Sequence, residues 1–138
     1  DNISELFRSA LSDLGTKGKN DGVPNQGDYQ KSDFVLLRSL RAFNNLNTRK
    51  VLTAWETTDQ YTSPDGQSFT RSMPDIRAKI LNNFLGLVDV AARLVVSKDE
   101  NGKEKRGFIL QPTQNVYAKN RLDDRKGALV SELVVSDG

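Results

Sequence analysis

Apolar residues recur at helical spacing in three stretches of the chain. The first stretch follows Asn2, which is able to cap a helix, and runs to Gly15, a residue typical of helix ends. A second helix is predicted over residues 32–45, and a third begins near Ser72, with Asp75 at the capping-box position. The pattern predicts three amphipathic helices, whose inward-facing residues are Ile3, Leu6, Phe7, Ala10, Leu11, Leu14, Val35, Leu36, Leu40, Phe43, Ile76, Ile80, Leu81 and Phe84.

Strand patterns lie between and after these helices. Lys50–Trp55 is apolar on both faces, which is typical of a central strand in a helix-covered sheet. From Val88 the apolar period changes to two, Asn101-Gly102 is a hairpin turn sequence, and Arg106–Leu110 forms the returning strand. The sequence therefore predicts an α/β fold, with helices on a mostly parallel sheet and a carboxyl-terminal antiparallel hairpin.

Two polar stretches interrupt the apolar pattern. We expect mobile loops at about residues 15–31 and 57–71, because their composition is rich in glycine and polar residues. The second stretch contains a type I turn sequence, Ser63-Pro64-Asp65-Gly66, flanked by Tyr61 and Phe69. With these loops included, residues 1–138 are expected to form a single domain.

Composition narrows the chemistry that is available. The chain has 138 residues, of which 36% are hydrophobic, and it contains neither cysteine nor histidine. Disulfides, thiolate metal sites and histidine general bases are therefore excluded, and catalysis would depend on carboxylates, lysine, arginine, tyrosine or hydroxyls. The net charge of +2 permits contact with nucleic acid without requiring it. No apolar stretch approaches the roughly 18 residues that span a bilayer, so we expect a soluble, cytoplasmic protein without membrane partners.

Three groups of residues stand out in order along the chain. Asp1 directly precedes the first helix, Glu56 ends the apolar run with Trp55, and Lys119-Asn120-Arg121 follows the predicted hairpin. In this order they resemble the RecA-like P-loop ATPase core, and they are most similar to the phage nucleotide-binding proteins of DNA recombination and single-strand annealing. In that resemblance Asp1 corresponds to a Walker B arrangement, and Lys119-Asn120-Arg121 to the basic finger that such proteins extend into a neighbouring subunit's nucleotide site.

The resemblance implies roles for these residues in phosphoryl transfer. Asp1 would hold Mg²⁺ through a water molecule, Glu56 would orient the attacking water or sense the γ-phosphate, and Lys119 and Arg121 would stabilise charge on phosphate oxygens. Structural alternatives stay open: Asp1 as a helix-start acid, Glu56 as a solvated carboxylate, and Lys119 with Arg121 as a surface charge pair.

The chain departs from that family in one respect, because it contains no Gly-x₄-Gly-Lys-[Ser/Thr] loop. We therefore expect the carboxyl-terminal part of a RecA-like core from a phage ATP-binding protein located in the host cytoplasm. The intact protein would use ATP and Mg²⁺, whereas this part alone would bind no cofactor and hydrolyse no ATP.

Partners follow from the same resemblance. A homo-oligomer is expected, and single-stranded DNA is a further candidate, contacted by Arg38, Arg41, Tyr61 and Phe69. The alternative is a non-enzymatic nucleic-acid-binding or assembly module.

Overall fold

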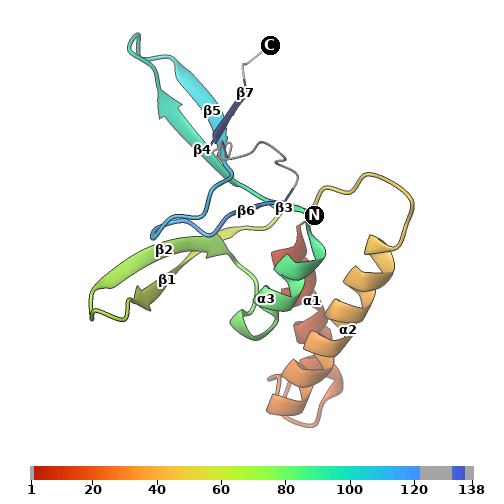
Figure 1. Cartoon of the computed structure of the whole chain (residues 1–138). Coiled ribbons are helices and arrows are strands. Elements are labelled where there is room, and N and C mark those ends of the chain that lie inside the picture. The colour runs from red at the N-terminus through yellow and green to blue at the C-terminus, as the bar shows by residue number, and fades with distance from the viewer. Residues whose placement is uncertain (1, 122–131, 136–138) are drawn as a thin grey trace. The chain divides into compact units, whose positions relative to one another are not determined.

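The computed structural model describes residues 2–121 and 132–135, and these form two compact units (Figure 1). Unit 1 consists of Asp1–Trp55 and Pro74–Leu87, and unit 2 consists of Glu56–Met73 and Val88–Gly138. The expected α/β class is confirmed, because the chain combines three helices with antiparallel strand pairs. None of the helices in the described residues is both long and apolar enough to cross a membrane.

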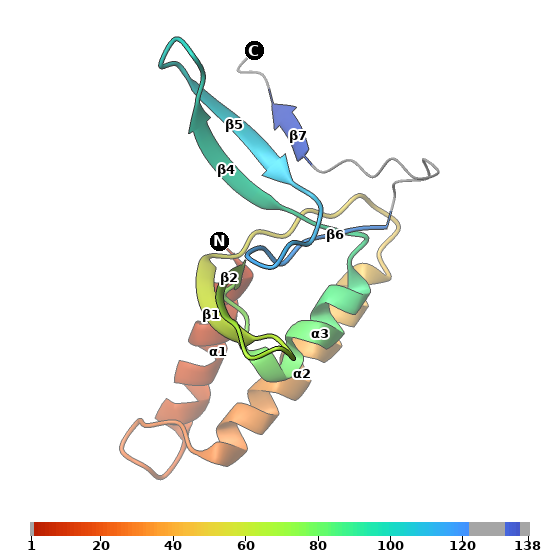
Figure 2. The same cartoon turned by 60° about the vertical axis from the view of Figure 1, so that its left-hand side comes forward.

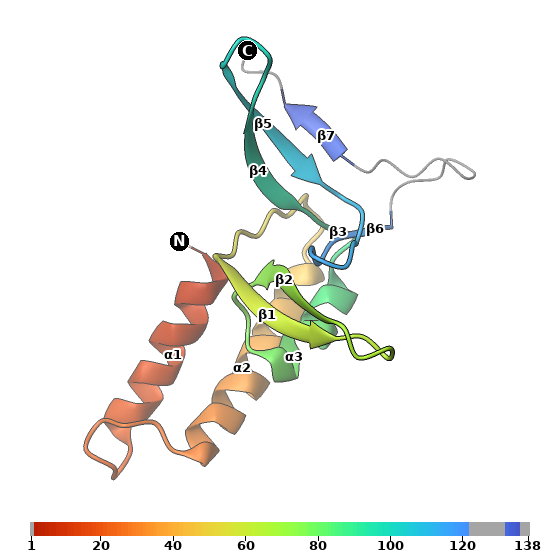
Figure 3. The ribbon, with the colours of Figure 1, turned by 90° about the vertical axis from the view of Figure 1, so that its left-hand side faces the viewer.

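Unit 1 contains the three helices, α1 (Ile3–Lys17), α2 (Gln26–Asn44) and α3 (Ala78–Leu87). The first begins where its cap was expected, since the Asn2 side chain accepts a hydrogen bond from the Glu5 amide at 2.9 Å. Helix α2 packs against both α1 and α3, and Figure 3 shows α1 and α2 side by side. Their contacts bury an apolar core consisting of Ile3, Leu36, Leu40, Ile76, Ile80, Leu81, Phe84 and Leu85.

The segment between α1 and α2 is shorter than the expected loop over residues 15–31. Helix α1 continues through Gly15 to Lys17, and α2 begins six residues before the expected Ser32. The earlier start has a local cause, because Asn25 and Asp28 form a complete capping box. Gly15 is buried, and a Cβ atom there would lie 2.8 Å from the Gly22 carbonyl oxygen. Its role is therefore to let the connection pack against the helix.

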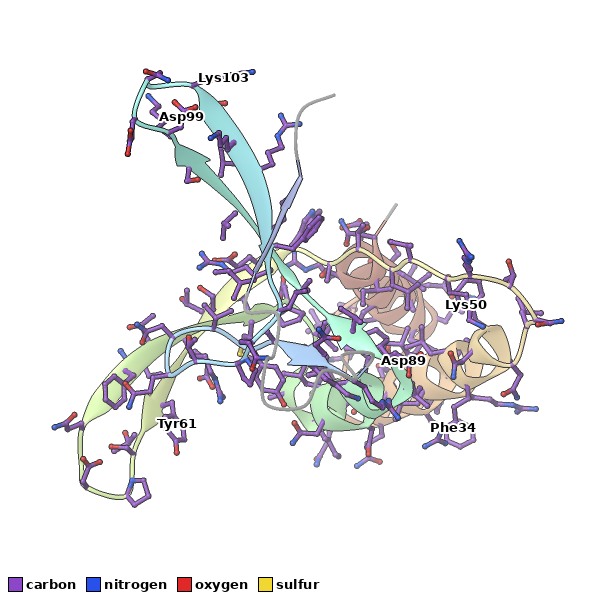
Figure 4. The ribbon with its side chains drawn as sticks, turned by 45° about the horizontal axis from the view of Figure 1, so that its top comes forward. Phe34, Lys50, Tyr61, Asp89, Asp99 and Lys103 are labelled. Atoms are coloured by element: carbon purple, nitrogen blue, oxygen red, sulfur yellow. The ribbon has the colours of Figure 1, made fainter. Side chains whose placement is uncertain are left out.

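Unit 2 is built from short antiparallel ladders. Strands β4 (Arg93–Lys98) and β5 (Glu104–Ile109) form the expected carboxyl-terminal hairpin, with β7 (Glu132–Val135) antiparallel to β5. Gly102 has a φ of 76° in the turn, and the Asp99 carboxylate accepts two backbone hydrogen bonds that close it. Figure 4 shows Asp99 and Lys103 at the tip of this hairpin. Strand β3 (Val90–Ala91) pairs antiparallel with β6 (Lys119–Asn120).

The polar stretch after Trp55 forms a second hairpin, made of β1 (Glu56–Thr62) and β2 (Ser68–Pro74). The predicted Ser63–Gly66 turn is present, since the Gly66 amide donates to the Ser63 carbonyl at 2.9 Å. Ser72 lies in β2 and does not begin α3. Its backbone exchanges hydrogen bonds with Asn115 and Tyr117, which fixes it in an extended conformation.

The strand expected at Lys50–Trp55 is not formed, although the segment contains no turn or bend. A strand requires a neighbour to pair with, and no strand in the described residues lies against this segment. For the same reason a mostly parallel sheet is not formed there. Among the described residues, the parallel pairing in the chain is an isolated bridge between Ser72 and Val116.

Candidate functional site

Glu56 begins β1 and is held by an arginine of β4. Arg93 donates from Nε to one Glu56 oxygen at 2.8 Å and from Nη2 to the other at 2.9 Å. These bonds lower the pKa of Glu56, more than its partial burial raises it, and a hydrogen bond from Ser72 acts in the same direction as Arg93. The carboxylate is therefore ionised at neutral pH, with both oxygens engaged by Arg93.

This ion pair makes a small pH-dependent contribution to stability. Because the folded-state pKa lies below the usual value of about 4.3, the contribution is present at neutral pH and is lost as the pH falls through the folded-state pKa. Both side chains are partly exposed, so we expect Glu56→Gln to destabilise the chain by about 0.5 kcal/mol near neutral pH. Urea unfolding should show the difference shrinking as the pH falls below about 4.3, the usual pKa of a glutamate.

Glu100 supplies the control, because it is exposed and has no ion-pair partner in the described residues. Glu100→Gln should change the free energy of unfolding little at any of these pH values. A Glu56→Gln difference that stays constant with pH would show that the carboxylate charge contributes nothing.

Lys119 and Arg121 approach the same backbone carbonyl. Lys119 Nζ donates to the Val88 oxygen at 2.8 Å, and Arg121 Nη2 donates to it at 2.9 Å. Arg121 also donates its backbone amide to the Asp89 carbonyl at 2.9 Å, and its Nε lies 3.5 Å from the Asp89 carboxylate. Alternation along an extended segment thus places both cations on one side. About half of the Arg121 side chain is exposed, so it is not locked in a buried ion pair.

The structure brings Lys119 and Arg121 together, whereas it places Glu56 with Arg93. Asp1 lies outside the described residues. Sequence reasoning missed Arg93, because no local motif connects it with a residue 37 positions earlier.

The four residues expected to contact nucleic acid lie in different units. Arg38 and Arg41 are exposed on α2 in unit 1. In unit 2, Tyr61 is 40% exposed and Phe69 is half-buried. The guanidinium of Arg71 lies 5.3 Å from the ring centroid of Tyr61 and 5.2 Å from that of Tyr117. One face of Tyr61 is thus covered by a cation–π contact that sequence reasoning did not anticipate.

Comparison with known proteins identifies the family. Over residues 1–122 the chain matches the family described as AAA domain. The chain belongs to the AAA domain family. It is therefore related to P-loop NTPases and is a nucleotide-binding, ATPase-like protein, in a family that typically depends on ATP and Mg²⁺. No match was found among curated proteins, and none was found among solved structures.

The dependence of this family on ATP and Mg²⁺ can be compared with the side chains of the described residues. Lys119 and Arg121 form a pair of cations of the kind that contacts phosphate oxygens. By contrast, the described residues contain no cluster of three acidic side chains that could hold a metal ion, and Glu56 is engaged by Arg93. Within the described residues, the structure thus places two cations side by side and groups no three acidic side chains.

Proposed function

We propose that the chain is the carboxyl-terminal part of a phage RecA-like ATPase that acts in DNA recombination or single-strand annealing in the host cytoplasm. The convergence of Lys119 and Arg121 on the Val88 carbonyl carries this proposal, within a chain of the AAA domain family. About half of the Arg121 side chain is exposed, and hydrogen bonds from a guanidinium or an ammonium to a phosphate group are stronger than those to a neutral carbonyl.

In this proposal each predicted residue keeps a distinct role. Lys119 and Arg121 stabilise negative charge on the γ-phosphate of a neighbouring subunit in a homo-oligomer. Glu56 orients the attacking water or senses the γ-phosphate once Arg93 releases it. Asp1 holds Mg²⁺ through a water molecule. The phosphate-binding loop comes from outside these residues, because they contain no Gly-x₄-Gly-Lys-[Ser/Thr] sequence.

Nucleotide binding and hydrolysis test the proposal directly. The 138 residues alone should show neither, because their sequence contains no Gly-x₄-Gly-Lys-[Ser/Thr] loop to cradle the β- and γ-phosphates. A chain extended upstream by the residues that its gene encodes before Asp1 should bind a fluorescent ATP analogue and hydrolyse ATP. Hydrolysis by the 138 residues alone would contradict the assignment of the phosphate loop, and an extended chain that neither binds nor hydrolyses ATP would contradict the ATPase function.

A second candidate function is a non-enzymatic nucleic-acid-binding module, and one face of α2 favours it. Phe34 is 65% exposed and projects from α2 in Figure 4. Lys31, Arg38 and Arg41 follow the same exposed stripe at helical spacing. An aromatic ring among cations is suited to stacking on a base while the cations contact phosphates. Single-strand binding that needs no nucleotide and weakens steeply between about 50 and 200 mM salt would select this function.

A further inference from the structure

The turn that joins β4 to β5 in unit 2 carries an asparagine followed by a glycine. Asn101 is exposed, and it is the only asparagine in the sequence that a glycine follows. Figure 2 shows the turn as the loop that closes the β4–β5 hairpin. Asparagine is chemically labile because the carbon of its side-chain amide can be attacked by the backbone nitrogen of the next residue. Such an attack is least hindered when the next residue is glycine, which has no side chain.

The atoms that would react are accessible in this turn. Within the part of the chain that the structure describes, no hydrogen bond engages the side-chain amide of Asn101. A Cβ atom built on Gly102 would have no neighbour within 4 Å among the described residues. Gly102 has a φ of 76°, so the turn itself favours glycine at this position. The residue that the turn requires is therefore also the one that leaves the attacking nitrogen least hindered.

Asp99 holds the turn closed through its backbone and its side chain. Its carboxylate accepts from the amides of Asn101 and Lys103, each at 2.9 Å. Its carbonyl accepts from the Gly102 amide, also at 2.9 Å. The Asp99 side chain is only 18% exposed, and Lys105 Nζ lies 3.5 Å from its second oxygen. The Gly102 nitrogen is thus held in a hydrogen bond, which has to open before this nitrogen can attack Asn101.

We propose that Asn101 is a deamidation site, and that Asp99 controls the rate of the reaction by keeping the turn closed. When the turn opens, the Gly102 backbone nitrogen gives its proton to solvent and attacks Cγ of Asn101. The new C–N bond closes a five-membered succinimide ring, and the side-chain nitrogen takes a proton from solvent and leaves as ammonia. One water molecule then opens the ring to aspartate or isoaspartate. The net reaction consumes that water, releases one ammonia and needs neither an oxidant nor a reductant.

The isoaspartate product changes the hairpin. In isoaspartate the main chain passes through Cβ, so one atom is added to the backbone between positions 101 and 102. This displaces the amides of Gly102 and Lys103 from the Asp99 carbonyl and carboxylate that accept from them. The product also places a new carboxylate beside those of Asp99 and Glu100. The reaction therefore loosens the β4–β5 ladder irreversibly at its turn.

Mass spectrometry of proteolytic peptides locates the reaction. Prolonged incubation of the 138-residue chain in mildly alkaline buffer should raise the mass of the peptide that contains Asn101 by about 1 Da, as NH₂ is replaced by oxygen, with release of ammonia. Asn115 is the internal control, because it is exposed but precedes the buried, β-branched Val116. An Asn101 peptide that gains mass no faster than the Asn115 peptide would overturn the proposal.

Asn101→Gln tests the ring that is formed. Glutamine keeps the side-chain amide, but attack by the Gly102 nitrogen would close a six-membered ring, for which the reacting atoms are less well placed. Ammonia release and isoaspartate formation at this position should therefore fall by at least about tenfold. Equal ammonia release from position 101 of both chains would show that the loss does not pass through a succinimide.

Asp99→Ala tests the control of the rate, with Glu100→Ala as the matched variant. Each substitution removes one negative charge close to Asn101, but only the first removes acceptors of turn hydrogen bonds. Asp99→Ala should speed deamidation by about fivefold or more because the turn opens more often, whereas Glu100→Ala should stay within about twofold of the original rate. Asp99→Asn keeps an oxygen that can accept from both amides, so it should restore most of the slow rate. Equal rates for Asp99→Ala and Glu100→Ala would overturn the role of Asp99.

Amide hydrogen exchange tests the structural consequence. The isoaspartate form can be separated from the original chain by its added charge. Exchange of the Gly102 and Lys103 amides should be at least about tenfold faster in this form, because both amides lose their acceptors on Asp99. Unchanged exchange at both amides would show that the turn survives the modification, which would overturn the proposed loosening of the hairpin.

Discussion

Replacement of Arg121 by alanine is expected to lower ATP turnover by about 10³-fold or more in a chain that carries the phosphate loop. The physical reason is that a guanidinium is needed most when negative charge spreads over the oxygens of the transferring phosphoryl group. Ground-state nucleotide contacts come mainly from the phosphate loop, so the affinity for a fluorescent ATP analogue should change by less than about tenfold. Steady-state hydrolysis and equilibrium binding, measured on the same preparation, separate these two effects.

Two further substitutions make the Arg121 result specific. Arg106→Ala removes an exposed arginine from β5 and should leave turnover within about twofold of the original, since no phosphate role is assigned to it. Arg121→Lys keeps the positive charge but loses the planar guanidinium fork, so it should recover only part of the rate. If Arg121→Ala hydrolyses ATP as fast as Arg106→Ala, Arg121 has no role in phosphoryl transfer.

Removal of Arg77 is expected to produce the largest loss of folding stability, about 3 kcal/mol. Its Nη1 donates to the Asp33 carboxylate at 2.6 Å and to the Tyr29 carbonyl at 3.3 Å, and its guanidinium lies 4.7 Å from the Tyr29 ring centroid. The Asp33 side chain is only 10% exposed, so Arg77→Ala leaves a buried carboxylate without its counter-charge. Urea unfolding followed by circular dichroism at 222 nm measures the loss in the helical unit.

The size of the Arg77 effect can be separated from that of a surface ion pair. Arg8→Ala breaks the ion pair with Asp75 and a stacking contact with Trp55, but the Arg8 side chain is 57% exposed and the cost should be about 1 kcal/mol. Replacing both members of the buried pair, as Asp33→Leu with Arg77→Met, should recover most of the stability that Arg77→Ala loses. Equal losses for Arg8→Ala and Arg77→Ala would contradict a buried-charge origin.

Local signals in the sequence predicted much of the secondary structure. The Asn2 cap, the Ser63–Gly66 turn and the Asn101-Gly102 hairpin turn each depend on neighbouring residues, and all three are present. The early start of α2 was also encoded locally, in Asn25 and Asp28, but the glycine-rich composition of that region favoured a loop.

Features that depend on residues far apart in the sequence could not be predicted from local sequence patterns. The apolar composition of Lys50–Trp55 indicated a buried strand, but the segment is exposed and forms no strand. Strand formation requires a paired neighbour, which the pattern of one segment does not reveal. The partners of Glu56 and Asp33 lie 37 and 44 positions away along the chain, and no motif links them. The placement of Lys119 and Arg121 on one side of the chain could be predicted, because it depends only on neighbouring residues of one extended segment.

The close packing at Gly15 has a mechanical consequence for unit 1. Because a Cβ atom on Gly15 would lie 2.8 Å from the Gly22 carbonyl oxygen and 2.9 Å from Pro24, the connection between α1 and α2 is closely packed against α1. We therefore expect the helix pair to be least able to move at this end. We expect a change in the angle between the two helices to displace the opposite end most, where the Ile3 amide donates to the Thr53 carbonyl.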